Sequence, residues 1–145
     1  MPVLWLLFAV LLSAAVFFDS EQTTLTRNLA VTEISAVSSS MLVYRNIVAN
    51  YAYANPAMTG SAPDVLLTLP NWYVRPPSLS NYISAGKSYV FFSEPLPGLA
   101  GELARRTEST NVGLNQNGVL WVPNKANSGI VLPAQIPNGS VVIIQ

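Results

Sequence analysis

Neither cysteine nor histidine occurs among the 145 residues of the chain. Without cysteine, the chain can form no disulfide, no thiolate nucleophile and no cysteine-ligated metal site. Without histidine, it also lacks the usual general base near neutral pH, the commonest metal ligand and the usual partner of a catalytic serine. We therefore expect that the protein is not an enzyme, and that it has no catalytic residue, no cofactor-binding residue and no metal ligand.

Charged residues are scarce as well. They make up 10% of the sequence, against about 25% in soluble globular proteins, whereas 50% of the residues are hydrophobic. The formal net charge is zero, and only Arg105 and Arg106 form a basic cluster. A nucleic-acid interface needs basic residues gathered on one face, so the sequence predicts no nucleic-acid partner. The length suits at most one ordinary domain.

One short string, Gly86-Lys87-Ser88, resembles the end of a phosphate-binding loop. The full motif needs another glycine five positions before the first of these residues, where this chain has Asn81. The motif also opens a helix, whereas residues 88–92 are β-branched and aromatic and predict a strand. The string therefore predicts a glycine turn that leads into a strand.

A serine–lysine hydrolase is the enzymatic alternative that the composition leaves open. Lys87 and Ser88 are the candidate pair, but adjacent side chains of a strand point to opposite faces of a sheet. The pattern therefore favours a non-enzymatic protein.

Residues 2–18 are apolar except for Ser13. As a helix, these 17 residues would extend about 26 Å, close to the ~30 Å thickness of a bilayer's hydrocarbon core. Trp5 suits the headgroup region at one end, and Asp19 marks the boundary at the other. The sequence predicts a transmembrane anchor over residues 1–20, which contacts membrane lipid through residues 2–18.

A cleaved signal peptide is the alternative for this segment. No lysine or arginine precedes the apolar run, although a signal peptide normally begins with a basic region. Cleavage near Ser13 or Ala15 would also leave three large apolar residues, 16–18, at the new terminus. We favour an uncleaved anchor in the bacterial inner membrane, with residues 21–145 forming a periplasmic domain, because acidic residues follow the run.

A long helix is predicted after the anchor. No proline or glycine occurs between residues 21 and 53, and Pro56 ends the pattern. Apolar residues recur in steps of three and four along residues 30–51, as they do on one face of a helix: Ala30, Ile34, Val37, Met41, Tyr44, Val48 and Tyr51. This face could pair with a second copy in a homo-oligomer. Leu42 and Ile47 widen it, however, which favours packing on a sheet of the same chain.

The remaining sequence alternates between short strands and turns. We predict strands at 65–70, 87–92, 130–132 and 141–144 and a short helix within 94–109. We also predict a hairpin in which Val112 and Leu114 lie on one side, Asn117-Gly118 form the turn and residues 119–122 return. Trp72 and Tyr73 are predicted to form a hydrophobic flap over the core. The whole pattern predicts an α+β fold, in which the long helix packs on a small, mainly antiparallel sheet, as in pilins.

Several strings resemble the PilM family: residues 44–60 (YRNIVANYAYANPAMTG), 67–70 (LTLP), 81–83 (NYI), 112–114 (VGL) and 136–142 (IPNGSVV). Together with the apolar N-terminal run, they cover nearly the whole chain. The family consists of small inner-membrane proteins encoded with the thin type IVb pili of conjugative plasmids, and is distinct from the actin-like protein of the same name.

This resemblance implies a non-enzymatic role in pilus biogenesis or in the basal body during conjugation, with other pilus or secretion-apparatus proteins as partners. It supplies no catalytic residue. The chain departs from an ordinary prepilin, because the apolar run begins at residue 2 and Glu21 follows it. The alternative function is a secreted minor pilin or adhesin-like subunit, in which Trp72, Tyr73, Tyr82 and Trp121 would be candidate contacts.

Overall fold

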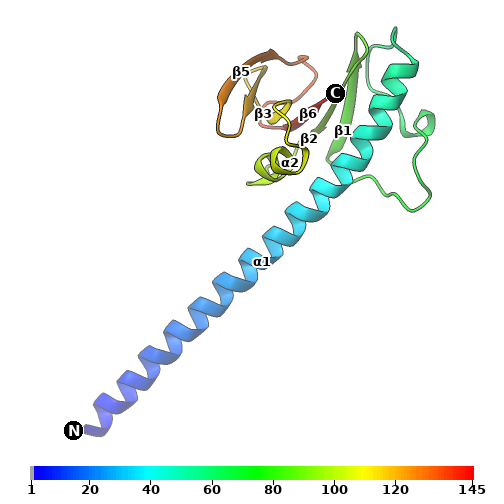
Figure 1. The fold of residues 1–145 in the computed structure, drawn as a ribbon. Helices are drawn as coiled ribbons and strands as arrows, with labels where there is room; N and C mark the ends of the chain where they lie inside the picture. The colour runs from blue at the N-terminus through cyan, green and yellow to red at the C-terminus, as the bar shows by residue number, and fades with distance from the viewer. Residues whose placement is uncertain (1) are drawn as a thin grey trace. The chain divides into compact units, whose positions relative to one another are not determined.

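The computed structural model describes the backbone of residues 2–145 and the side chains of residues 26–125 and 127–145. The chain divides into two compact units, and the boundary between Glu33 and Ile34 lies within helix α1. The elements are, in chain order, helix α1 (Pro2–Ala54), the 3₁₀ helix η1 (Asp64–Leu66), strands β1 (Leu79–Ser84) and β2 (Lys87–Phe92), helix α2 (Leu99–Thr107) and strands β3 (Val112–Gln116), β4 (Val119–Val122), β5 (Ala126–Val131) and β6 (Val141–Ile144) (Figure 1).

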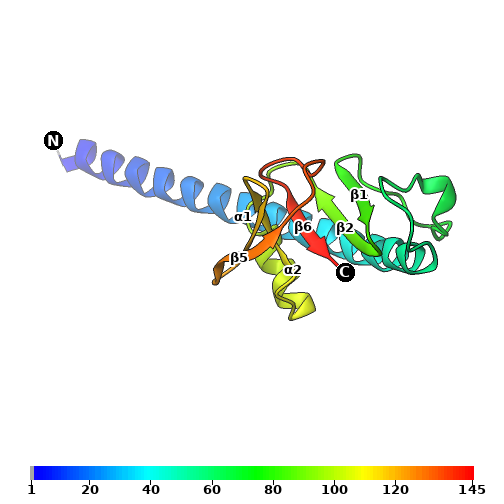
Figure 2. The same cartoon turned by 90° about the horizontal axis from the view of Figure 1, so that it is seen from above.

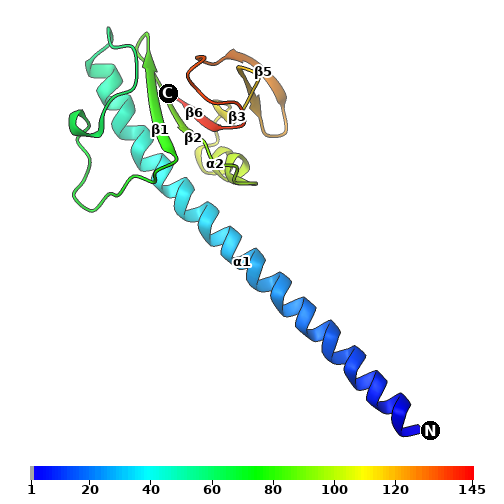
Figure 3. The same cartoon turned by 180° about the vertical axis from the view of Figure 1, so that it is seen from behind.

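The six strands form one sheet in the order β1-β2-β6-β3-β4-β5, and every neighbouring pair is antiparallel. The predicted α+β class is therefore confirmed. The C-terminal strand β6 lies between β2 and β3, with Val141 opposite Phe92 and Ile143 opposite Val112 (Figure 3). Both of its edges are paired, as an apolar strand requires if it is to stay soluble.

The structure does not test the predicted membrane anchor. Among the residues that the structure describes, no helix is long and apolar enough to cross a membrane. The predicted anchor, residues 1–20, lies outside the residues whose side chains are described, and it stays a prediction.

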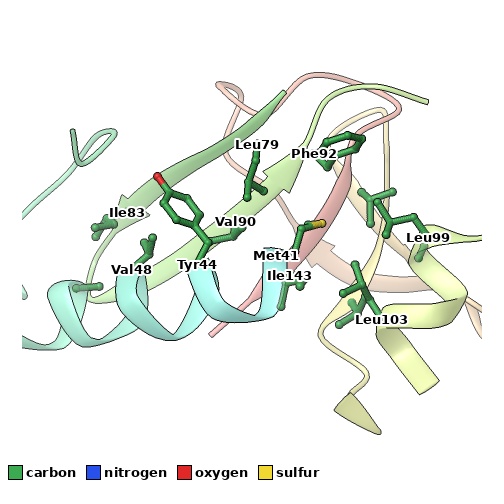
Figure 4. Packing of buried hydrophobic residues seen from close by; sticks show 14 of the residues in the cluster. Met41, Tyr44, Val48, Leu79, Ile83, Val90, Phe92, Leu99, Leu103 and Ile143 are labelled. Carbon is green, nitrogen blue, oxygen red and sulfur yellow. The ribbon is translucent and has the colours of Figure 1, made fainter. Parts of the chain in front are cut away.

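The C-terminal part of α1 packs on one face of the sheet. Met41, Tyr44 and Val48 are buried on the helix, at the spacing that one helical face requires. Against them lie Val90 and Ile143, together with further buried residues of the sheet and of α2: Leu79, Ile83, Phe92, Leu99, Leu103, Val112 and Val141 (Figure 4). The predicted helix–sheet packing is confirmed from Ile34 to Tyr51, whereas Ala30 is exposed.

A second apolar cluster covers the opposite face of the sheet. Tyr89 and Phe91 of β2 and Val142 of β6 point to this face, because they alternate with the residues that contact α1. Leu132 and Ile136, from the segment between β5 and β6, complete the cluster. The middle of the sheet is thus covered on both faces, which explains why β2 is apolar at successive positions.

One strand prediction was wrong, and one strand was missed. Residues 65–70 do not pair with the sheet, because the N–H groups of Leu66 and Leu67 donate to the carbonyls of Pro63 and Asp64 within a local turn. Strand β1, in contrast, was not predicted. Its inward positions alternate correctly, but the polar Asn81 between two apolar residues hides the pattern. Strand β5 (Ala126–Val131) also begins earlier than the predicted 130–132.

We expect Gly113→Ala to lower the free energy of unfolding by about 1–3 kcal/mol, as overpacking of a core does. A Cβ atom at Gly113 would overlap the carbonyl oxygen of Trp121 on the neighbouring strand β4. Urea denaturation measures the change. The control is Gly101→Ala in α2, where the added Cβ meets nothing within 4 Å beyond the neighbouring helix backbone. This variant should be as stable as the wild type, or more stable by up to about 1 kcal/mol. Equal effects of the two variants would contradict the close approach at Gly113.

Candidate functional site

The segment between α1 and β1, residues 55–78, carries four exposed apolar side chains, which we call the exposed loop residues: Val65, Leu66, Trp72 and Val74. Trp72 is 73% exposed and Val65 is 90% exposed. Figure 2 shows this segment beside β1, at the edge of the sheet opposite β5. Apolar side chains gathered on one exposed segment mark a candidate interaction site.

An ion pair joins the two parts of the loop that carry these residues. Arg75 Nε donates a hydrogen bond of 2.8 Å to Asp64 Oδ2. Asp64 precedes Val65, and Arg75 follows Val74, so the pair holds both parts together. The guanidinium also donates to the carbonyl oxygen of Leu79, at the start of β1.

Tyr44 connects this ion pair to α1. Its hydroxyl donates to Asp64 Oδ1 at 3.3 Å and accepts a hydrogen bond of 2.7 Å from Asn81 Nδ2. The guanidinium carbon of Arg75 lies over its ring, 5.8 Å from the ring centroid, which is within the range of a cation–π contact. The helical stripe places Tyr44 on the buried face of α1, so the loop is fixed to the core of the domain.

Asn81 holds the same loop to the sheet. Its amide Nδ2 also donates to the carbonyl oxygen of Ala62 at 2.8 Å, and its Oδ1 accepts from the N–H of Ala62 at 2.8 Å. Asn81 is only 3% exposed, so each of these groups would be costly to leave without a partner. A buried asparagine in the middle of a strand is explained by this role.

Tyr73 lies against the other side of the network. Its ring stacks on that of Tyr44 with centroids 6.2 Å apart, and its hydroxyl donates to the carbonyl oxygen of Ser40 at 3.1 Å. Trp72 meets Tyr73 edge to face, with centroids 6.0 Å apart. The predicted flap over the core is therefore confirmed for Tyr73, which packs against the core, and wrong for Trp72, which is 73% exposed.

The electrostatics of the network suit a structural role. Burial raises the pKa of Tyr44 to about 12 and also raises the pKa of Tyr73. The hydrogen bond to Asp64 is the main cause that raises the pKa of Arg75. Both hydroxyls therefore stay neutral and the guanidinium stays charged throughout the physiological range. The two tyrosines and Arg75 therefore keep their hydrogen bonds over this range.

The pairing of Asp64 with Arg75 leaves no periodic pattern in the sequence. The two residues are eleven positions apart in a segment without helical or strand periodicity. The usable signal was the series of prolines at 63, 70 and 76, which marks residues 63–76 as an irregular loop. A loop of that length needs specific contacts to be ordered, and a single acid and a single base within it are natural partners.

A groove adjoins the exposed loop residues. It has a volume of about 290 Å³, lies between the end of α1 and the loop, and is lined by Ile47, Asn50, Tyr51, Ala54, Leu66 and Thr68. None of these side chains is charged. A second groove of about 180 Å³ lies at the start of α2 and is mainly apolar, with Leu96, Leu114 and Val141 among its lining residues.

Both edges of the sheet are protected against a further strand. At β1, Gly60 and Ile83 exchange two backbone hydrogen bonds of 2.9 and 2.8 Å, so the loop occupies the position of a neighbouring strand. At β5, the side chains of Asn127 and Ser128 accept from the N–H groups of Gly129 and Ile130. Edges blocked in this way disfavour strand addition.

The other candidate residues lie apart from this loop. Lys87 is exposed and Ser88 is buried, where its hydroxyl donates to the carbonyl of Gln145. The preceding turn has positive φ at Ala85 and Gly86, which confirms the predicted glycine turn. Tyr82 packs against the second apolar cluster, and Trp121 on β4 is 37% exposed.

The arginine pair of α2 is used within the domain. Arg106 donates to Ser35 and Ser39 of α1 at 2.9 and 2.7 Å, so it fixes α2 against α1. Arg106 and Arg105 also donate to Glu102, and these hydrogen bonds lower the pKa of Glu102 to about 2.

We expect Tyr44→Phe to lower the free energy of unfolding by about 1–2 kcal/mol at neutral pH, because Asn81 and Asp64 lose a partner. The pH dependence gives a second signature. A phenol in the unfolded chain loses its proton near pH 10, whereas Tyr44 in the folded protein keeps it until about pH 12. The unfolded state therefore binds fewer protons in this interval, and stability falls as pH rises through it.

Tyr44→Phe should lose less stability than the wild type between about pH 10 and pH 12, as measured by denaturant unfolding at a series of pH values. Tyr53→Phe is the matched control, since this ring is 88% exposed at the end of α1. A Tyr44→Phe variant whose stability and pH profile both match the control would refute the network.

Comparisons with known proteins are consistent with the resemblance found in the sequence. The PilM family model matches residues 7–144. A crystal structure of a protein described as PilM from Escherichia coli B7A is 27% identical over 79% of this chain and 93% of that chain, with a TM-score of 0.61. Another, described as PilM from Pseudomonas aeruginosa 2192, is 41% identical over 78% of this chain and 95% of that chain, with a TM-score of 0.52. No curated protein matches the chain. Because the family model covers nearly all of the sequence, the chain belongs to the PilM family.

Proposed function

We propose that this protein is a non-enzymatic component of type IV thin pilus biogenesis or of its basal body in bacterial conjugation. The PilM family match over residues 7–144 is the observation that carries the proposal. In this role, residues 1–20 anchor the chain in the inner membrane, and residues 21–145 form the periplasmic domain. The apolar run at 2–18 supports the anchor, because its length is close to the hydrocarbon thickness of a bilayer.

The exposed loop residues are proposed as the contact with another protein of the pilus or secretion apparatus. Trp72 combines a large apolar surface with an N–H donor, and such side chains dominate the energetics of many interfaces. The two charged groups nearest in sequence, Asp64 and Arg75, already pair with each other. The partner surface should accordingly be apolar and uncharged.

A homo-oligomer would have to use another part of the helix. The stripe from Ile34 to Tyr51 packs on the sheet of the same chain, so it is not free for a second copy. Leu29 and Val31, which are 71% and 60% exposed, remain as apolar positions of α1 within residues 26–33. Helix pairing between copies would therefore use the exposed side chains of Leu29 and Val31, near the start of the predicted 30–51 stripe.

The proposed anchor is tested by membrane fractionation of the full-length chain expressed in bacteria. We expect the protein to stay in the membrane pellet after alkaline carbonate and to retain its intact mass. Deletion of residues 2–18 is the control and should release the domain. Extraction of the intact full-length chain by carbonate would overturn the anchor. A mature product that begins near Ala15 would instead support the alternative, a secreted minor pilin or adhesin-like subunit.

The proposed contact is tested with a photo-crosslinking amino acid at position 72 in cells that assemble the pilus. We expect covalent capture of a pilus or secretion-apparatus protein, identified by mass spectrometry. Position 131 is the matched control, since Val131 is 75% exposed on β5, on the opposite edge of the sheet. Trp72→Ala should abolish pilus-dependent conjugation with little change in thermal stability. Equal capture from both positions, or normal conjugation by the variant, would argue against the loop as the contact.

A further inference from the structure

The chain contains two Asn–Gly dipeptides, Asn117-Gly118 and Asn138-Gly139. The first forms the turn between β3 and β4, and the second lies just before β6. Both asparagine side chains are exposed. The fold nevertheless brings the two dipeptides to the same buried residue, Asn115, which is 2% exposed.

Asn–Gly bonds are chemically labile because glycine has no side chain to hinder attack by its own amide. The backbone nitrogen of the glycine attacks the side-chain carbonyl carbon of the asparagine, and a new C–N bond closes a five-membered succinimide. The carboxamide nitrogen leaves as ammonia, taking up the proton that the backbone amide loses. Water then breaks one of the two C–N bonds of the ring, which yields aspartate or isoaspartate. The reaction needs no reagent other than water.

Asn115 engages the attacking nitrogen of both dipeptides. The N–H of Gly118 donates to the side-chain Oδ1 of Asn115 at 2.9 Å, and the N–H of Gly139 donates to the backbone carbonyl oxygen of Asn115 at 2.8 Å. An amide nitrogen that donates such a hydrogen bond is held at its acceptor and retains its proton. Each glycine must therefore break its bond to Asn115 before it can attack.

The surrounding loop is fixed by the same side chain. Asn115 Nδ2 donates to the carbonyls of Ile136 and Pro137 at 2.8 and 3.1 Å. The exposed amide of Asn138 is also held, because its Oδ1 accepts from the N–H of Asn117 at 2.8 Å. This bond holds the side-chain carbonyl of Asn138, which the Gly139 nitrogen would attack, against the β3–β4 turn. The second dipeptide is thus restrained at both of its reacting groups.

We propose that Asn115 suppresses the deamidation of both Asn117 and Asn138 in the folded protein. The consequence is structural as well as chemical. Positions 117 and 118 both have positive φ, at 53° and 81°, as a two-residue hairpin turn requires. Isoaspartate at this point adds a carbon to the backbone and breaks the register of β3 with β4. The same amide therefore protects the covalent integrity of the turn and fixes the loop over the second apolar cluster.

The test follows deamidation at positions 117 and 138 by peptide mapping during incubation at mildly alkaline pH. In the folded wild type, both positions should react at least about tenfold more slowly than in the denatured wild type, since each attack requires a hydrogen bond to open. This comparison needs no variant. Equal rates in the folded and denatured chains would overturn the proposal.

Two substitutions separate the two effects of Asn115. Asn115→Ala removes the acceptor of Gly118 and the anchors of the loop, so both positions should deamidate on the order of tenfold faster in the folded variant. Asn115→Asp retains an acceptor oxygen for Gly118 but loses the donor to Ile136. In this variant Asn138 should accelerate, whereas Asn117 should stay slow.

Asn127→Ala is the matched control, because Asn127 also accepts from a glycine amide, that of Gly129, but lies outside this cluster. It should leave both rates unchanged. Circular dichroism establishes that each variant is folded. Wild-type rates at both positions in folded Asn115→Ala would show that this side chain does not protect them. If that variant does not fold, Asn115→Asp and the wild-type comparison decide the proposal.

Discussion

Two long irregular segments must satisfy their buried backbone groups without a helix or strand to do so, and a buried asparagine provides the partners in each case. Asn81 of β1 bonds both backbone groups of Ala62 in the loop that follows α1. Asn115 of β3 bonds the carbonyls of Ile136 and Pro137 in the loop that precedes β6. Each amide would be costly to bury alone, and each makes three hydrogen bonds through its side chain. Each loop is therefore fixed to the sheet, one at its edge and one over its second face, where Leu132 and Ile136 are buried.

This arrangement also determines which surfaces a partner can meet. The loop held by Asn81 pairs with β1 through Gly60, and the side chains of Asn127 and Ser128 accept from the N–H groups of Gly129 and Ile130 within β5. Strand addition, a frequent mode of recognition in β-rich proteins, is disfavoured at both ends of the sheet. The same loop that closes one edge presents Trp72 to solvent. The contacts that hold this loop against β1 therefore both cover the edge of the sheet and leave Trp72 exposed.

Local patterns in the sequence were sufficient to predict the elements that form between residues close together in the chain. The steps of three and four from Ile34 to Tyr51 predicted the helical face that packs on the sheet, and Asn117-Gly118 predicted the β3–β4 turn. Contacts between distant residues were not predictable in this way. No periodicity indicates that Asp64 pairs with Arg75, or that β6 inserts between β2 and β3. The missed strand β1 has the same cause, since its central Asn81 faces inward only to bond a loop that lies nineteen residues earlier.

The fixed loop bears on the energetics of any contact that it makes. Ordering an irregular segment costs roughly 1–2 kcal/mol per residue in backbone entropy, and a flexible loop would lose this free energy at the moment of binding. Here the hydrogen bonds among Tyr44, Asp64 and Arg75 order the segment when the domain folds. Tyr73 stacks on Tyr44, and Trp72 contacts Tyr73 in a T-shaped arrangement. The indole is therefore presented on a surface that is already organised, so a partner gains apolar contact without ordering the backbone. In the contact proposed above, a small interface can then be specific, because the domain and not the partner orders the backbone that carries Trp72.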